Sequence, residues 1–219
     1  MAAARLYAIE DIRIDHIPKP ELERDQVLIK VMTVGVCGSD VHYYKHGHIG
    51  SNFLDGPLVL GHELSGVIVE TGKEVDPSRV GQRVAVEPQK PCGGCDKCLD
   101  GQYNLCRDMQ FYATPPIDGA FAEFVAIQSK FAFEIPDSMS FESAALIEPL
   151  SVGIWSCKKA NVVPGTRVLI AGAGPIGMVC IMAAKASETG TVGFVGGMNV
   201  PLISAFACGY VGGVKSVDP

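Results

Sequence analysis

Three residues of this 219-residue chain carry side chains that zinc prefers as ligands. His62 and Glu63 are adjacent, and Gly61 and Gly66 on either side let the backbone come close. Cys37 lies upstream and can supply a thiolate from a neighbouring loop. Three protein ligands leave one position of a tetrahedral zinc ion open, as in catalytic zinc sites. The trio therefore predicts a catalytic metal site, although a His-Glu pair taken alone is more often an ordinary polar pair.

Four further cysteines form a second group of a different kind. Their spacing is C-x2-C-x2-C-x7-C, and they are Cys92, Cys95, Cys98 and Cys106. Four thiolates at such short separations can close a tetrahedral site and leave no position for water or substrate. The pattern predicts a structural zinc site that acts on stability rather than on chemistry. The alternatives are free or disulfide-bonded cysteines, and an iron–sulfur cluster, which also takes four thiolates.

A glycine-rich motif lies near the end of the chain. Gly172-Ala173-Gly174-Pro175-Ile176-Gly177 directly follows the apolar run Val168 to Ala171. A G-x-G-x-x-G sequence between a buried strand and a helix is typical of dinucleotide-binding domains, in which the helix N-terminus receives the pyrophosphate. The predicted cofactor-binding residues are Gly172, Gly174, Pro175, Ile176 and Gly177. No carboxylate stands where the second strand should end, at 191–197, so the sequence does not separate NAD from NADP.

The elements that must position these residues follow from the apolar pattern. Runs rich in β-branched residues at 5–17, 26–36, 66–70, 83–87 and 122–127 predict strands, and their spacing predicts a barrel or a sandwich. A loop is expected from Val41 to Asp55. From Ser140, as N-cap, apolar residues at helical spacing predict a helix. The expected fold is α/β with a β-rich part, with a zinc-binding domain over 1–155 and a Rossmann-like segment over 156–219.

Composition excludes several classes of function. The 18 basic and 24 acidic residues give a net charge of −6 with no basic run, so the footprint of a nucleic-acid-binding protein is missing. No apolar run reaches the roughly 18 residues of a membrane-spanning helix. The N-terminus lacks the pattern of a signal peptide. These features predict a cytoplasmic protein that interacts with neither membranes nor nucleic acid, and whose cysteines are reduced.

The pattern G-H-E-x2-G-x5-G-x2-V runs from Gly61 to Val75, with Cys37-Gly38-Ser39-Asp40 before it. Over roughly residues 3–183 the chain resembles the zinc-containing medium-chain alcohol dehydrogenases, and most closely their sorbitol and xylitol (polyol) branch. The resemblance implies a GroES-like β-barrel catalytic domain followed by an incomplete Rossmann-like segment. It also implies oxidation of a secondary alcohol of a polyol to a ketone, with zinc and NAD as cofactors. Members commonly form dimers or tetramers, and whether this chain is a homo-oligomer stays open.

The resemblance assigns roles that the motifs alone do not. Ser39 and His42 would pass a proton outward, and Glu148 would hold the water of the catalytic zinc or coordinate the ion in place of Glu63. The residues matching the substrate pocket are Tyr43, Ile49, Phe53, Phe111 and Thr114. Simpler alternatives stand beside these roles: Phe111 in the core, Thr114 capping a turn, Glu148 on a solvated helix face, and His46 and His48 on a solvated loop.

After about Lys185 the resemblance stops. Residues from about 186 to 219, with the runs 201–206 and 209–215, are similar instead to a fragment of the basic membrane protein family of nucleoside-binding ABC-transporter lipoproteins. This similarity suggests a fusion or a truncation, and therefore an inactive remnant that binds zinc but not cofactor as an alternative function. A nucleoside-receptor module is a third hypothesis, weakened by the lack of an export signal. If the chain is not a fusion, Val192 to Val195 is expected to form the second strand of a divergent dinucleotide domain.

Overall fold

A computed structural model of the protein describes residues 1–187 and the backbone of residues 191–195. The chain forms two compact units, Met1–Ile147 and Glu148–Pro219. The division between them falls earlier than the predicted break after residue 155, because helix α4 belongs almost wholly to the second unit. The predictions made for residues 201–215 lie outside the described residues.

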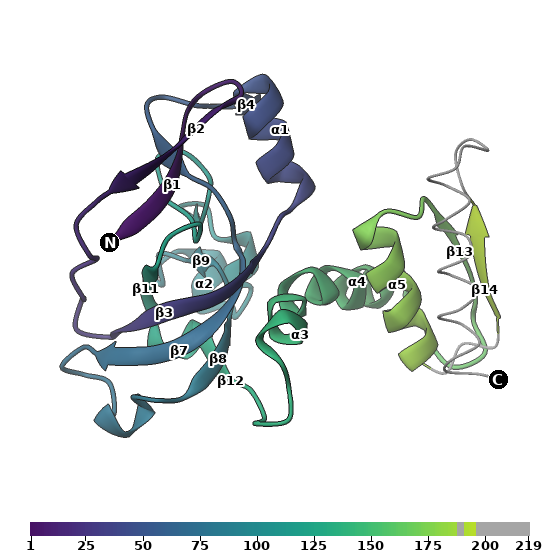
Figure 1. Cartoon of the computed structure of the whole chain (residues 1–219). Coiled ribbons are helices and arrows are strands. Elements are labelled where there is room, and N and C mark those ends of the chain that lie inside the picture. The colour runs from purple at the N-terminus through teal and green to yellow at the C-terminus, as the bar shows by residue number, and fades with distance from the viewer. Residues whose placement is uncertain (188–190, 196–219) are drawn as a thin grey trace. The chain divides into compact units, whose positions relative to one another are not determined.

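A five-stranded antiparallel sheet forms the centre of the first unit, with strand order β11-β3-β7-β8-β12 (Figure 1). The strands are β3 (Gln26–Gly35), β7 (Glu63–Thr71), β8 (Arg83–Val86), β11 (Phe124–Gln128) and β12 (Ala132–Glu134). Alternate side chains point to one face, where Val27, Ile29, Leu64 and Ile68 join one buried cluster. Burial of these β-branched and aliphatic residues against one another is what makes the runs form strands. The predicted β-rich part is confirmed.

Smaller sheets complete the first unit. The order β2-β1-β6 joins Asp11–His16, Ala2–Ala8 and Leu58–Val59, while β4 (His48–Ile49) pairs with β5 (Asn52–Phe53) and β9 (Gln89–Lys90) with β10 (Gln110–Phe111). The predicted run at 5–17 is part of a hairpin, and it turns at Glu10, which has a φ of 60°. A second apolar cluster contains Leu6, Tyr43 and Leu60.

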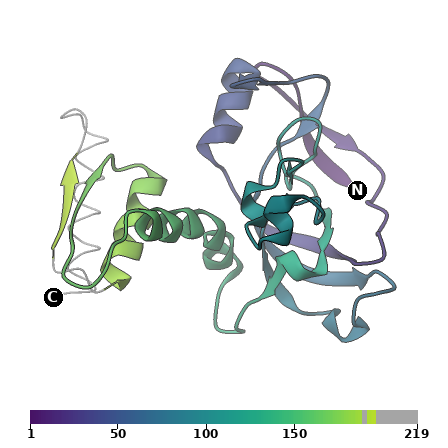
Figure 2. The same ribbon diagram turned by 180° about the vertical axis from the view of Figure 1, so that it is seen from behind.

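The helices of the first unit are short. They are α1 (Gly38–His46), α2 (Asp96–Leu99) and α3 (Phe141–Ala145), with 3-10 turns at Pro77–Arg79, Tyr103–Leu105 and Ser129–Phe131. Figure 2 shows α2 on the side of the sheet that is turned away from the viewer in Figure 1. Ser140 caps α3 as predicted, because its hydroxyl accepts a hydrogen bond from the Ser143 N–H at 3.1 Å.

Helix α1 corrects the loop expected from Val41 to Asp55. The helix has no apolar face, so hydrophobic periodicity could not reveal it. Its ends define it instead: the Asp40 carboxylate accepts a hydrogen bond from the Cys37 N–H at 2.9 Å. At the other end Gly47 adopts a left-handed φ of 72° and its N–H donates to the Tyr43 carbonyl at 2.8 Å. Such caps satisfy the backbone groups that a short helix leaves open.

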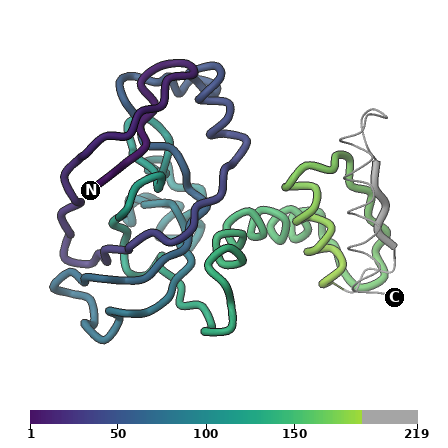
Figure 3. Tube along the Cα trace, in the orientation of Figure 1, coloured from purple at the N-terminus to yellow at the C-terminus, as the bar shows by residue number. Residues whose placement is uncertain are grey.

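The second unit contains a strand–helix–strand arrangement. Helix α4 (Ile147–Lys159) precedes β13 (Arg167–Ala171), α5 (Pro175–Ala186) and β14 (Thr191–Val195), and β13 and β14 pair in parallel with Arg167 opposite Thr191. Figure 3 traces the part of this path from α4 through β13 to α5. Residues 192–195 therefore occupy the place of the second strand of a dinucleotide domain. Within the described residues, none of the helices has the length and apolar character needed to cross a bilayer.

Candidate functional site

The structure brings Cys37, His62 and Glu63 together. One ligand atom from each, the thiol sulfur, a ring nitrogen and a carboxylate oxygen, lies within 4.8 Å of the other two. His62 and Glu63 are 7% and 8% exposed, and Cys37 is half-buried. The pairing of β3 with β7 creates this proximity, because Gly35 at the end of β3 lies opposite Glu63 at the start of β7. Cys37 follows two residues later, just before α1.

Two glycines leave the space that this arrangement needs. A Cβ at Gly35 would overlap the Glu63 carboxylate at Oε2, so the carboxylate occupies the place that any side chain would take. Gly61 has a φ of 87°, and a Cβ there would lie 2.6 Å from the Phe121 ring. The backbone conformation just before His62 therefore requires glycine at position 61.

Asp40 lies beside the metal group and supports it through its hydrogen bonds, although the sequence did not mark it as a candidate. Its carboxylate is 3% exposed and accepts two backbone hydrogen bonds, from Cys37 at 2.9 Å and from Gly61 at 2.8 Å. It also lies 3.9 Å from His62 Nδ1. One carboxylate thus joins the segment that carries the thiol to the segment that carries the imidazole. Its position three residues after the helix N-cap is a capping-box pattern, which was the available signal.

We expect Asp40→Asn to weaken zinc binding at the Cys37 group by about tenfold or more, since partners that orient metal ligands contribute on that scale. The amide can accept only one of the two N–H groups and leaves the other facing its own NH₂. The free energy of unfolding should therefore fall by about 1–3 kcal/mol. Zinc competition titration and urea unfolding measure the two effects. Asp76→Asn, which alters a cap on an exposed 3-10 turn, should leave zinc affinity unchanged, and equal zinc affinity in Asp40→Asn would contradict the prediction.

The electrostatics of the group favour a metal. Hydrogen bonding to His62 lowers the pKa of the Cys37 thiol, Ser39 adds to the effect through its side chain and its N–H, and burial opposes it. A thiol whose pKa is lowered is more readily the thiolate that binds metal. Thiolate, imidazole and carboxylate are together a ligand set that suits zinc with one position open. The residues present therefore fit the ion that the sequence predicts.

One predicted substrate residue lies beside this group. The rings of Phe111 and His62 have centroids 5.4 Å apart at an angle of 60°, an edge-on contact. Thr114 follows in a turn in which its carbonyl accepts from the Ile117 N–H at 2.7 Å. The structure thus brings Phe111 to the predicted metal group, while contact of Phe111 or Thr114 with a substrate stays a prediction.

The other predicted residues are described by the elements and clusters that contain them. Tyr43 is 2% exposed in the apolar cluster with Leu6, and Ile49 packs against that cluster. Phe53 is 63% exposed and stacks on a histidine ring. Glu148 lies in the first turn of α4, in the second unit. Their contacts with substrate or metal stay predictions.

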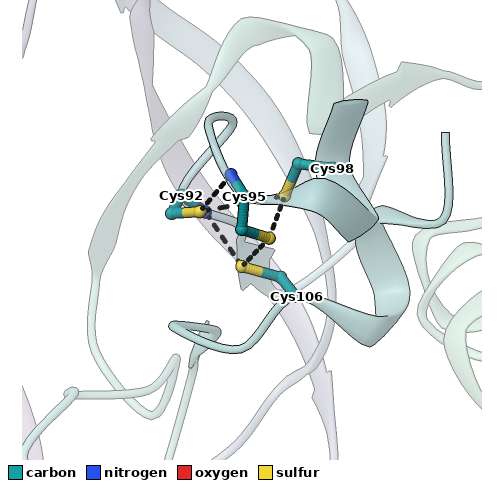
Figure 4. A group of neighbouring side chains, drawn as sticks. All are labelled: Cys92, Cys95, Cys98 and Cys106. Carbon is teal, nitrogen blue, oxygen red and sulfur yellow. Dashed lines mark hydrogen bonds between the residues drawn. The ribbon is translucent and has the colours of Figure 1, made fainter. Parts of the chain in front are cut away.

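The four predicted cysteines also converge, within one loop that contains α2 (Figure 4). Their sulfur atoms lie 3.6 Å apart for Cys95 and Cys98, and 3.9 Å apart for Cys92 and Cys98 and for Cys95 and Cys106. Zinc–sulfur bonds of about 2.3 Å in a tetrahedron place the sulfur atoms about 3.8 Å apart. These separations fit a single ion, whereas the thiolates of an iron–sulfur cluster are distributed over several iron atoms. The described cysteines form no disulfide.

Two of these thiols have strongly shifted pKa values. A hydrogen bond from the backbone of Arg107 lowers the pKa of Cys95 to about 6. Desolvation, together with the neighbouring Cys95 sulfur, raises the pKa of Cys98 to about 12. Four sulfur atoms this close cannot all ionise without a cation between them, so a divalent ion would relieve the repulsion.

The glycine-rich motif has the geometry of a phosphate-binding turn. Gly172 follows β13 with a φ of 103°, and a Cβ on Gly177 would overlap the Gly172 carbonyl, so both positions need glycine. Gly174 is the N-cap of α5, in an extended conformation, with no atom within 4 Å of its Cβ position. Pro175 opens the helix and Ile176 is 44% exposed. The first N–H groups of α5 are therefore accessible to an anion.

Comparisons with known proteins show which proteins this chain is similar to. The family model "Alcohol dehydrogenase GroES-like domain" matches residues 23–137. Sorbitol dehydrogenase of Bacillus subtilis is 50% identical over 192 residues, which are 88% of this chain and 54% of that protein. A probable D-xylulose reductase A of Aspergillus fumigatus is 47% identical over 182 residues, 83% of this chain and 51% of that protein. The chain thus spans about half the length of these relatives. Galactitol-1-phosphate dehydrogenase of Escherichia coli has a similar structure, with a TM-score of 0.82 and 32% identity over 94% of this chain and 59% of that one.

Proposed function

Because this chain belongs to the zinc-containing medium-chain alcohol dehydrogenases, in their polyol branch, we propose that it oxidises a secondary alcohol of a polyol to a ketone and transfers the hydride to NAD. The observation that carries the proposal is the convergence of Cys37, His62 and Glu63, with the Phe111 ring beside them. The names of the relatives support sorbitol or xylitol as the type of substrate.

Cys37, His62 and Glu63 would hold the catalytic zinc, and the ion when bound supplies a Lewis acid that lowers the pKa of an alcohol. The chain's own residues then have separate tasks. Ser39, whose hydroxyl lies against the Cys37 sulfur, relays a proton: its oxygen accepts the proton of the substrate hydroxyl while its own hydroxyl proton passes on toward His42. His42 lies three residues later on the same face of α1 and is exposed, so it can release that proton to water. The Phe111 ring, in edge-on contact with the imidazole of His62, would limit the access of water to that side of the site.

The turn from Gly172 to Gly177 would bind the pyrophosphate of the cofactor at the N-terminus of α5. NAD, when bound, accepts the hydride of the substrate. The preference for NAD over NADP rests on family membership, because no carboxylate stands at the end of β14 in the sequence. The same proposal includes a cytoplasmic location. It is supported by the described cysteines, none of which forms a disulfide bond.

The proposal is tested by titrating NAD⁺ calorimetrically into the zinc-loaded chain, and by following NADH absorbance with sorbitol and with xylitol. We expect micromolar to low-millimolar binding of NAD⁺ and turnover of at least one polyol. Gly174→Val is the matched variant, because its extended backbone tolerates valine while the side chain would fill the space above the helix N-terminus. The variant should keep its zinc and lose NAD⁺ binding.

A zinc-binding chain that does not bind cofactor is the second candidate. Two observations favour it. The chain spans 54% of the length of the Bacillus subtilis relative, and the described part of the second unit contains a sheet of two strands, β13 and β14, where a complete dinucleotide domain has more. Two zinc ions per chain with no detectable binding of NAD⁺ would support this candidate and contradict the first.

A further inference from the structure

Three of the five histidines of the chain gather at the end of α1. The ring centroids of His42 and His46 are 4.5 Å apart, and those of His42 and His48 are 6.1 Å apart. No role in the sites described above uses His46 or His48. The group is separate from the two groups of metal-ligating residues already described, because it shares no residue with them.

The fold places these rings together through two local features. His42 and His46 are four residues apart on α1 and therefore share one helix face. Gly47 then ends the helix in a left-handed conformation, and the chain turns back so that His48 begins β4. Phe53 lies opposite His48 in the β4–β5 pair, and the two rings stack with centroids 5.0 Å apart at 29°. The third imidazole thus packs against Phe53.

The hydrogen bonding of His48 gives an independent observation. His48 is half-buried, and its Nδ1 atom is buried without a hydrogen-bond partner in the described structure. A buried polar atom without a partner is costly, and a bound cation or a proton donor would satisfy it. His42 and His46 are exposed, so their rings can rotate at little cost.

The spacing of the rings suits one metal ion. A metal–nitrogen bond of about 2.0–2.1 Å places a ring centroid about 3.2 Å from the ion, and two such rings in a tetrahedron are about 5 Å apart. The observed separations of 4.5 and 6.1 Å lie on either side of that value. Among the described residues, only the two groups already discussed have all ligand atoms within 4.8 Å of one another, so these imidazoles must rotate to converge on an ion.

We propose that His42, His46 and His48 form a third metal site, which takes a divalent late transition ion such as nickel, copper or zinc. Imidazole nitrogens select these ions over magnesium or calcium, which prefer oxygen ligands. If the proposed function holds, an ion at this site occupies the ring of His42 that would release the substrate proton. The site would then allow excess metal to inhibit the enzyme.

Nickel titration of the chain, after both thiolate-containing sites have been loaded with zinc, tests the site directly. We expect one nickel ion to bind with micromolar affinity, and its paramagnetism to broaden the NMR signals of the three imidazoles. His46→Ala and His48→Ala should each weaken the binding by about tenfold or more. His16→Ala is the matched control, since His16 is exposed on β2 away from the group, and it should bind nickel as the wild type does.

Nickel binding that is unchanged in His46→Ala would overturn the proposal, as would broadening of His16 in place of the three imidazoles. His46 is exposed, and the variant is expected to fold. The result is also separable from the proposed function. A chain that binds nickel at these residues but turns over no polyol supports the site and contradicts the enzymatic proposal.

Discussion

Replacing Cys106 with serine is expected to remove one of the two zinc ions for which the chain has ligand groups. Cys106 is the buried member of the four-cysteine group, and its sulfur accepts a hydrogen bond from the Cys92 N–H at 3.2 Å. Serine keeps the size of the side chain but does not supply a thiolate, so the tetrahedral set is broken. Because binding of a structural zinc is also folding free energy, the loop from Cys92 to Cys106 should lose its conformation.

Zinc content by mass spectrometry should fall from two ions to one in Cys106→Ser, and limited proteolysis should cut within residues 92–106. Cys180→Ser is the matched control, because it makes the same chemical change at a half-buried cysteine of the second unit. That variant should keep both ions. A Cys106→Ser protein that retains two zinc ions would contradict the assignment of the loop as a metal site.

Replacing Glu63 with glutamine is expected to weaken zinc binding strongly at the group of Cys37, His62 and Glu63. Glutamine has the shape of Glu63 but lacks the charged oxygen that zinc binds, so zinc affinity at the Cys37 group should fall by about 100-fold. Loss of the Lewis acid would cost about 4 kcal/mol of transition-state stabilisation, or about 10³-fold in turnover of a polyol. Zinc competition titration and NADH formation measure the two losses.

Gly35→Ala is also expected to weaken zinc binding at the Cys37 group and to slow the turnover of a polyol. Its methyl group would overlap Glu63 Oε2 and displace the carboxylate, while Cys37, His62 and Glu63 all remain in the sequence. Glu70→Gln, an exposed position on the same strand, should change neither measurement. If Glu148→Gln loses the zinc while Glu63→Gln keeps it, the third ligand comes from α4 and the prediction is wrong.

The sequence predicted which candidate ligands converge, because ligand spacing is local information. The four cysteines lie within fifteen residues, and His62 and Glu63 are adjacent. The strands were also predictable, since β-branched runs bury one face. The resemblance to polyol dehydrogenases supplied Phe111, and the structure places its ring against His62.

The positions that support the metal group were not predictable in this way. Asp40 bonds to Gly61, twenty-one positions along the chain, and Gly35 makes room for Glu63. Such contacts depend on the register of β3 against β7, which is irregular between Val31 and Thr33. A one-residue change in that register would direct each side chain to the opposite face. Helix α1 was missed because its capping residues, rather than an apolar face, define it.

The Asp40 carboxylate connects the backbone at Cys37 to the backbone at Gly61 by two hydrogen bonds. Neither hydrogen bond involves an atom that would bind the metal. We therefore expect Cys37 and His62 to keep their spacing without an ion, which would reduce the entropy lost when an ion binds. The hydrogen bonds of the cysteine loop run instead to the sulfur ligands themselves, from Cys92 to Cys106 and from Cys95 to Cys92. We therefore expect a zinc ion bound by the Cys37 group to exchange without unfolding of its surroundings, and a zinc ion bound by the cysteine loop to leave only when the loop loses its conformation.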